Sequence, residues 1–179
     1  GPYICSEWDF GGRPWWLLKN SDLQLRCMEE NYIAAVDRFF DDFIPRIAKH
    51  QLTEGGNVIL VQVENEYGSY GEDKPYVSAI RDCLRGIYGK ELALFQCDWS
   101  SNFTKNGLDD LVWTMNFGTG SHIDNQFRHL KQLRPDSPLM CSEFWSGWFD
   151  KWGARHETRP AKDMVAGLDE MLSKGISFS

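Results

Sequence analysis

The amino-acid sequence predicts an α/β fold built from consecutive βα units, and three observations support this prediction. Short apolar runs alternate along the whole chain with longer segments whose apolar residues recur at helical spacing. This alternation is typical of a parallel sheet whose strands are joined by helices. Several of the short runs are apolar at nearly every position, as expected for strands that are covered on both faces. We therefore expect a parallel sheet with helices packed against it.

The expected strands are short apolar runs bounded by glycine, proline or polar residues. They cover residues 3–7, 58–63, 92–97, 111–116 and 139–143, and a sixth begins at 176–178. The expected helices lie between strands, at residues 30–47, 75–88, 123–133 and 161–172. Pro45 falls inside the first helix and is expected to kink it, whereas Gly89 is expected to end the second.

The number of strands predicts an incomplete eight-stranded βα barrel. A closed barrel needs about 250 residues, whereas this chain has 179 residues and begins and ends within strand-like runs. We therefore expect an interior segment of a larger barrel; the alternative is a complete open sheet of six strands. Such a segment has exposed sheet edges, so we expect it to be inactive and prone to aggregate when expressed alone.

Composition excludes several classes of function. A formal net charge of −7 argues against a nucleic-acid partner, which calls for clustered lysine and arginine. No apolar stretch approaches the ~20 residues that a membrane span requires. The four histidines lack short ligand spacing and the five cysteines include no C-x-x-C pair, so neither a metal nor a cofactor is expected. Cys5, Cys97 and Cys141 lie in apolar runs and are expected to be buried.

Three glutamates occupy positions where parallel barrels carry their active sites. Glu7, Glu66 and Glu143 each follow an apolar run, at the carboxyl end of an expected strand. The strands of Glu66 and Glu143 are separated by two others, so in a closed barrel they face each other across its mouth. Two converging carboxylates perform glycoside hydrolysis, one as nucleophile and one as acid and base. Glu64 competes with Glu66, because alternation along a strand points both to the same side.

Tryptophans follow the same expected strand ends. The chain contains eight tryptophans, and Trp8, Trp145 and Trp148 lie directly after strands rather than within helical stripes. An indole face packs well on the C–H face of a sugar ring. We therefore expect these three to wall a sugar pocket; the alternative is that they fill a large core.

Three blocks of the sequence resemble one family. Residues 55–68, Gly-Gly-Asn-Val-Ile-Leu-Val-Gln-Val-Glu-Asn-Glu-Tyr-Gly, closely resemble the signature of the β-galactosidases of glycoside hydrolase family 35. Residues 1–8 and residues 142–153 look like two further blocks of that family, in the family's order. The resemblance implies a partial (β/α)8 TIM barrel that covers roughly strand 3 to the start of strand 8. Residues 1–179 would then be a segment of a single catalytic domain, and the remaining strands and accessory β domains would belong to the full-length chain.

The resemblance also implies a reaction. The family resembled consists of retaining exo-β-galactosidases, which hydrolyse terminal non-reducing β-D-galactosyl residues of glycans or oligosaccharides by double displacement and without a cofactor. Glu66 matches the acid/base and Glu143 the nucleophile. Two alternatives are an exo-β-glucosaminidase-like hydrolase and a non-catalytic carbohydrate-binding barrel. The presence of both glutamates speaks against the binding barrel, since a binding module has no need of both.

Four further residues match binding positions of the family. Asn65 matches an asparagine that contacts the sugar near its 2-hydroxyl, Glu7 a carboxylate that binds galactose hydroxyls, and Ser6 a neighbouring pocket position. Trp148 is expected to border the aglycone side. Alanine is commoner in the family at the position of Ser6, and an apolar residue at that of Arg13, so the preferred linkage stays open.

Overall fold

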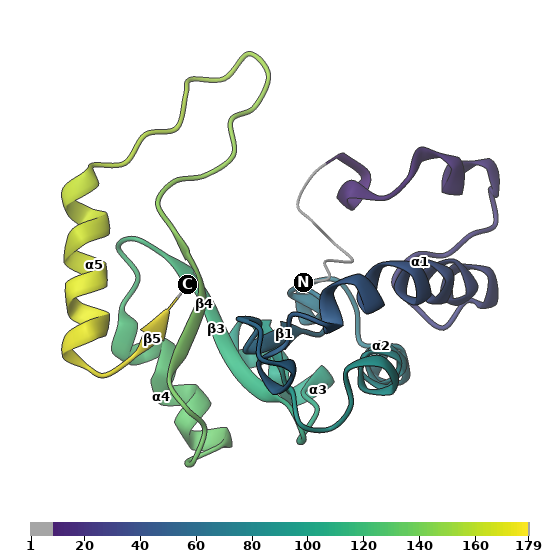
Figure 1. The fold of residues 1–179 in the computed structure, drawn as a ribbon. Helices are drawn as coiled ribbons and strands as arrows, with labels where there is room; N and C mark the ends of the chain where they lie inside the picture. The colour runs from purple at the N-terminus through teal and green to yellow at the C-terminus, as the bar shows by residue number, and fades with distance from the viewer. Residues whose placement is uncertain (1–8, 179) are drawn as a thin grey trace.

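The computed structural model describes residues 9–178, and these form an α/β fold, as the sequence predicts. The strands are β1 (Leu60–Gln62), β2 (Ala93–Asp98), β3 (Val112–Gly118), β4 (Met140–Trp145) and β5 (Ser177–Phe178). They form one sheet in the order β1-β2-β3-β4-β5, and all neighbouring strands are parallel. The sheet curls into a half-barrel (Figure 1), so the predicted partial barrel is confirmed. The strand expected at residues 3–7 lies outside the described residues, together with Ser6, Glu7 and Trp8.

Helices connect the strands close to the predicted positions. They are α1 (Glu30–Ala48), α2 (Lys74–Tyr88), α3 (Phe103–Asn106), α4 (Ile123–Leu133) and α5 (Ala161–Ser173). Short 3-10 helices lie at η1 (Asp9–Gly12), η2 (Trp15–Lys19), η3 (Leu52–Glu54), η4 (Tyr67–Ser69) and η5 (Ser100–Asn102). Gly89 caps α2 with a φ of 79°, as predicted. Pro45 lies within α1, which continues to Ala48.

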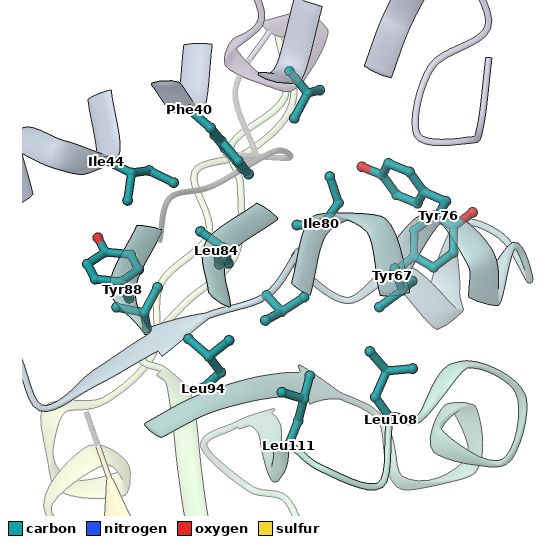
Figure 2. Close-up of a cluster of buried hydrophobic side chains, with 14 of the residues drawn as sticks. Phe40, Ile44, Tyr67, Tyr76, Ile80, Leu84, Tyr88, Leu94, Leu108 and Leu111 are labelled. Atoms are coloured by element: carbon teal, nitrogen blue, oxygen red, sulfur yellow. The ribbon is translucent and has the colours of Figure 1, made fainter. Parts of the chain in front are cut away.

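The first core lies between helices α1 and α2 and strands β1 and β2. Four buried residues recur at every fourth position of α1, namely Tyr32, Val36, Phe40 and Ile44, and therefore form one stripe along the helix. Figure 2 shows side chains of α2, including Ile80 and Leu84, between this stripe and the strand residue Leu94. This packing anchors the β1 end of the sheet, where Glu64 and Glu66 follow.

The second core lies beneath strands β3 and β4 and is covered by helices α4 and α5 (Figure 1). Its fully buried side chains are Met115, Phe117, Leu130, Cys141 and Met171. Cys97 on β2 is also buried, so the predicted burial of two of the cysteines is confirmed, whereas Cys5 lies outside the described residues. This core anchors the other end of the sheet, which carries Glu143.

Strands β1 to β4 each end one or two residues from the predicted position, and the differences at β1 and β4 affect the glutamates. β1 ends at Gln62, and Glu64 and Glu66 have left-handed φ angles of 59° and 46°. The expectation that strand alternation points residues 64 and 66 to the same side is therefore wrong, because neither residue is extended. β4 continues past Glu143 to Trp145, so Glu143 lies within its strand rather than at its end.

Candidate active site

Glu64 is enclosed by hydrogen-bond donors. Its side chain is 1% exposed. Oε1 accepts hydrogen bonds from Arg26 Nε at 2.9 Å and Tyr76 Oη at 2.7 Å, and Oε2 accepts from Arg26 Nη2 at 2.7 Å and the Asn65 backbone nitrogen at 2.6 Å. Burial, and next to it the Glu64 charge, raises the pKa of the Tyr76 phenol, so Tyr76 remains a donor. Both oxygens of Glu64 are thus engaged within the protein.

Arg26 holds this cluster together. Its guanidinium lies over the rings of Tyr70 and Tyr67, at 4.3 and 5.4 Å from the ring centres. Nη2 also donates to the carbonyl oxygen of Asn65 at 2.6 Å, and Tyr67 Oη donates to the carbonyl oxygen of Arg26 at 2.9 Å. A left-handed backbone at a non-glycine residue costs about 1–2 kcal/mol. The contacts of Arg26 offset that cost at Glu64 and fix the turn that follows β1.

Asn65 lies between the two glutamates and is buried. Its side-chain Oδ1 accepts a hydrogen bond from Gln62 Nε2 at 2.9 Å and lies 3.3 Å from Cys97 Sγ. Since Gln62 Nε2 can only donate, this contact assigns Oδ1 to the interior and leaves Nδ2 as the donor face of the amide. The predicted sugar-contacting residue is therefore held in one orientation.

Glu66 is the partly exposed glutamate of the turn. Its Oε1 accepts a hydrogen bond from Asn116 Nδ2 at 2.9 Å. Asn116 belongs to β3 and is fully buried. Its Oδ1 accepts in turn from Ser142 Oγ of β4 at 2.7 Å, and Ser142 Oγ lies 2.6 Å from Thr114 Oγ1. Glu66 thus contacts a neutral amide where Glu64 contacts a guanidinium.

A β-bulge places Glu143 beside the same asparagine. Along β3 the register advances from Met115 to Asn116, while along β4 it advances from Cys141 to Glu143. Ser142 is therefore an extra residue on β4, which is the arrangement of a bulge. As a result, Ser142 reaches Asn116 by a hydrogen bond and Glu143 is its register partner. Asn116 thus contacts Glu66 by a hydrogen bond and is the register partner of Glu143.

Aromatic side chains extend from Glu143 along the loop that follows β4. Trp145 Nε1 donates to Glu143 Oε2 at 3.0 Å. The ring of Trp145 lies 5.6 Å from that of Trp99 and 5.7 Å from that of Trp148, edge to face in both cases. Trp148 is 54% exposed, so it does not fill a core. These three indoles form a surface beside Glu143, and the third tryptophan expected there, Trp8, lies outside the described residues.

Asp98 supports the loop that carries Glu66. Its Oδ2 accepts from the Gly68 backbone nitrogen at 2.7 Å, and its Oδ1 accepts from Trp99 N at 2.8 Å and Asn102 Nδ2 at 2.7 Å. Burial is the main cause that raises the pKa of Asp98. Asp98 and Asn116 were not selected from the sequence. Both are polar residues at the carboxyl end of an apolar run, and this signal would have found them.

The described residues contain no group of three histidine, cysteine, aspartate or glutamate side chains arranged to hold a metal ion. Among residues 9–178, no helix has both the length and the apolar character needed to cross a membrane.

The whole chain, residues 1–179, matches the family model of the glycosyl hydrolases family 35. It belongs to glycosyl hydrolase family 35. The family resemblance inferred from the three sequence blocks is therefore confirmed, as is the α/β barrel architecture that it implied.

Relatives in family 35 are similar over the entire chain. The "Beta-galactosidase" of Homo sapiens is 40% identical over 182 residues, which cover 100% of this chain and 27% of that protein. The "Beta-galactosidase-1-like protein" of Mus musculus is 38% identical over 180 residues, covering 100% and 28%. The "Beta-galactosidase-1-like protein 3" of Rattus norvegicus is 41% identical over 181 residues, covering 100% and 28%. The chain thus spans just over a quarter of the length of these relatives.

Proposed function

We propose that the protein is a retaining exo-β-galactosidase that releases terminal non-reducing β-D-galactosyl residues from glycans or oligosaccharides. The observation that carries this proposal is the contrast between neighbouring carboxylates. Glu64 is buried in an ion pair with Arg26. Glu66, by contrast, is partly exposed and is linked through Asn116 to the strand that carries Glu143. Family membership and the names of the relatives support β-galactoside as the substrate class.

In this mechanism Glu143 is the nucleophile. Its carboxylate attacks the anomeric carbon, and the bond from that carbon to the glycosidic oxygen breaks. The hydrogen bond from Trp145 Nε1 to Glu143 Oε2 orients the carboxylate for this attack. The product of the step is a covalent galactosyl-enzyme.

Glu66 is the acid and then the base. It gives its proton to the leaving glycosidic oxygen in the first step. In the second step the Glu66 carboxylate takes a proton from water, the resulting hydroxide attacks the anomeric carbon, and the Glu143 carboxylate leaves. Each glutamate returns to its starting protonation state, and the anomeric configuration is retained.

Substrate binding involves the remaining predicted residues. Asn65 contacts the sugar near its 2-hydroxyl and Trp148 borders the aglycone side, the roles that their matches to family positions imply. Glu7 and Ser6 complete the galactose pocket in this proposal, as matches to family positions. Further barrel strands and accessory domains of the full-length protein are the partners of this segment.

The experiment compares three variants of the full-length protein on aryl and natural β-galactosides. Glu66→Gln lowers kcat by about 10²–10⁴-fold, the usual contribution of a general acid or base. Glu143→Gln lowers kcat at least as much, because no covalent intermediate forms. Glu64→Gln is the matched control two positions from Glu66 and retains most of the turnover of folded enzyme. Near-normal turnover by Glu66→Gln or Glu143→Gln contradicts the proposal.

Azide separates the two roles. With azide, Glu66→Ala yields β-galactosyl azide, because azide needs no base to attack the galactosyl-enzyme. Glu143→Ala yields the α-azide, because azide enters directly from the face that the nucleophile occupied. The opposite pattern would exchange the roles. A parallel screen with β-glucosaminides decides the sugar, since preference for those substrates would replace galactose with glucosamine.

A further inference from the structure

A chain of hydrogen bonds links Glu66 to the strand of Glu143. It runs from Thr114 Oγ1 to Ser142 Oγ at 2.6 Å, from Ser142 Oγ to Asn116 Oδ1 at 2.7 Å, and from Asn116 Nδ2 to Glu66 Oε1 at 2.9 Å. Thr114 and Asn116 are fully buried. Because a buried polar group without a partner is costly, these contacts are strongly favoured over their loss.

The chain has a defined direction. The Ser142 hydroxyl has one proton and donates it to Asn116 Oδ1. Thr114 Oγ1 also has one proton and lies 3.2 Å from the Gln96 carbonyl oxygen and 2.6 Å from Ser142 Oγ. With the Ser142 proton given to Asn116, the shorter contact takes the Thr114 proton, and Thr114 donates to Ser142. With Oδ1 occupied as an acceptor, the amide presents Nδ2 to Glu66. Rotating the amide by half a turn would place Oδ1 against Oε1 of the ionised Glu66 carboxylate, which has no proton to donate. Ser142 therefore keeps Asn116 a donor toward Glu66.

This direction determines which oxygen of Glu66 carries the proton. In a neutral carboxylic acid the carbonyl oxygen is the better acceptor, and the hydroxyl oxygen is the donor. The N–H of Asn116 thus selects Oε1 as the carbonyl oxygen. We propose that Asn116 is a positioning residue that directs the transferable proton of Glu66 to Oε2, and that Ser142 acts through Asn116. This proposal rests on the role of Glu66 as the acid/base.

The same hydrogen-bonded residues link the position of Glu66 to that of Glu143. Ser142 is the extra residue of the bulge that also makes Glu143 the register partner of Asn116. One amide therefore contacts the acid/base directly and lies opposite the nucleophile. The bulge on β4 couples the position of the nucleophile to the orientation of the proton donor.

The first test measures Asn116→Ala in the full-length enzyme as a function of pH. A donor to a carboxylate favours its ionised form, so loss of Asn116 makes Glu66 hold its proton to higher pH. The basic limb of kcat/KM, which reports the acid, shifts upward by about one pH unit. A merely structural role for Asn116 leaves this limb in place.

The second test varies the leaving group. A misdirected proton matters most when the leaving oxygen is basic, so kcat/KM of Asn116→Ala falls by about 10–100-fold on an alkyl β-galactoside. On 2,4-dinitrophenyl β-galactoside, whose leaving group needs no proton, it stays within about threefold of wild type. An equal loss on both substrates overturns the proposal.

Controls keep the tests decisive. Asn106 is a buried asparagine that takes no part in the hydrogen bonds from Thr114 to Glu66; it donates to the Gly71 carbonyl oxygen at 2.7 Å. We expect Asn106→Ala to leave the pH profile and the leaving-group dependence unchanged. Ser142→Ala frees the amide to rotate and shows both effects in the same direction but smaller. If Asn116→Ala does not fold, Ser142→Ala is the deciding variant. An unchanged pH profile and an unchanged leaving-group dependence in Ser142→Ala then overturn the proposal.

Glu66→Ala separates this proposal from the proposed function. If Glu66→Ala shows no leaving-group dependence, Glu66 is not the acid and both proposals fail. If Glu66→Ala shows that dependence and Asn116→Ala does not, only the role of Asn116 fails.

Discussion

Two carboxylates two residues apart, Glu64 and Glu66, have opposite surroundings. Glu64 is enclosed by four donors and carries a buried ion pair to Arg26. Glu66 is partly exposed and receives a hydrogen bond from the neutral amide of Asn116. The first site joins loops of the fold, and the second opens toward the strand of the other candidate catalytic glutamate.

The difference teaches what an acid catalyst requires. The buried Arg26 guanidinium and the other donors occupy both oxygens of Glu64, so neither oxygen is exposed to a substrate. The amide of Asn116 donates to Oε1 of Glu66, and Glu66 stays partly exposed. Arg26 therefore makes Glu64 a structural residue, and Asn116 leaves Glu66 able to exchange a proton.

The largest expected effect is on stability, from the Glu64 side. Arg26→Met leaves a buried carboxylate without its partner and lowers the free energy of unfolding by about 3–5 kcal/mol. Urea unfolding of the full-length protein measures it. The control is Arg46→Met, which breaks the exposed pair between Arg46 and Asp42 and leaves the unfolding midpoint unchanged. Equal effects of the two substitutions would refute the contrast between the sites.

The next effect isolates a single donor to Glu64. Tyr76→Phe removes the 2.7 Å hydrogen bond to Glu64 Oε1 and lowers the free energy of unfolding by about 1.5–3 kcal/mol. It leaves the leaving-group dependence of catalysis unchanged, because the hydrogen bond that it removes belongs to Glu64 and not to Glu66. A change in that dependence would mean that the two carboxylates act as one unit.

Tyr76 also predicts a pH dependence. The folded state holds the phenol proton more tightly than the unfolded chain, whose tyrosines ionise near pH 10. The stabilisation is therefore complete below about pH 10 and is lost as the pH rises above that value. Wild type loses stability between about pH 10 and 11.5 more steeply than Tyr76→Phe. Parallel pH curves for the two proteins would exclude this contribution.

A smaller effect concerns the loop that follows Glu66. In Gly68→Ala the new Cβ would lie 2.3 Å from Asn102 Cβ and 2.7 Å from Asp98 Oδ2, so the loop must shift. We expect a loss of about 1–3 kcal/mol in stability together with reduced kcat. Gly86→Ala is the control, because its Cβ meets no atom within 4 Å, and it is neutral or stabilising. Normal kcat in Gly68→Ala would show that this loop does not position Glu66.

The smallest expected effect is on the rate at which a thiol reagent labels Cys97. Cys97 Sγ lies 3.0 Å from Gln62 Nε2, and burial raises the pKa of this thiol to about 12. At pH 8 a thiol reagent therefore labels the partly exposed Cys27 before Cys97, which it reaches only as the protein opens. Peptide mass spectrometry locates the label. We expect Cys97 to be labelled faster in Arg26→Met than in Tyr76→Phe. That result would show, without urea, that Arg26 stabilises the surroundings of Glu64 more than Tyr76 does.

Much of the fold could be predicted from sequence because its signals are local. Helix α4 has the predicted limits, Ile123–Leu133, and α2 ends at Tyr88, directly before the predicted Gly89, since apolar spacing and a terminal glycine suffice to specify them. The short helix α3 was not predicted, because four residues give no periodic pattern. The left-handed turns at Glu64 and Glu66 were also missed, because neither residue is a glycine that would signal such a backbone.

The sequence by itself determined the order of the predicted strands and helices and the four glutamates, Glu7, Glu64, Glu66 and Glu143, that are candidates for chemistry. Only the tertiary structure decided which glutamate is enclosed and which meets the strand of Glu143. Those decisions depend on contacts between distant positions, 38 residues apart for Arg26 and Glu64 and 50 residues apart for Asn116 and Glu66. The bulge at Ser142 likewise arises from the pairing of β3 with β4. Local spacing cannot encode such contacts, because they exist only once the strands lie side by side.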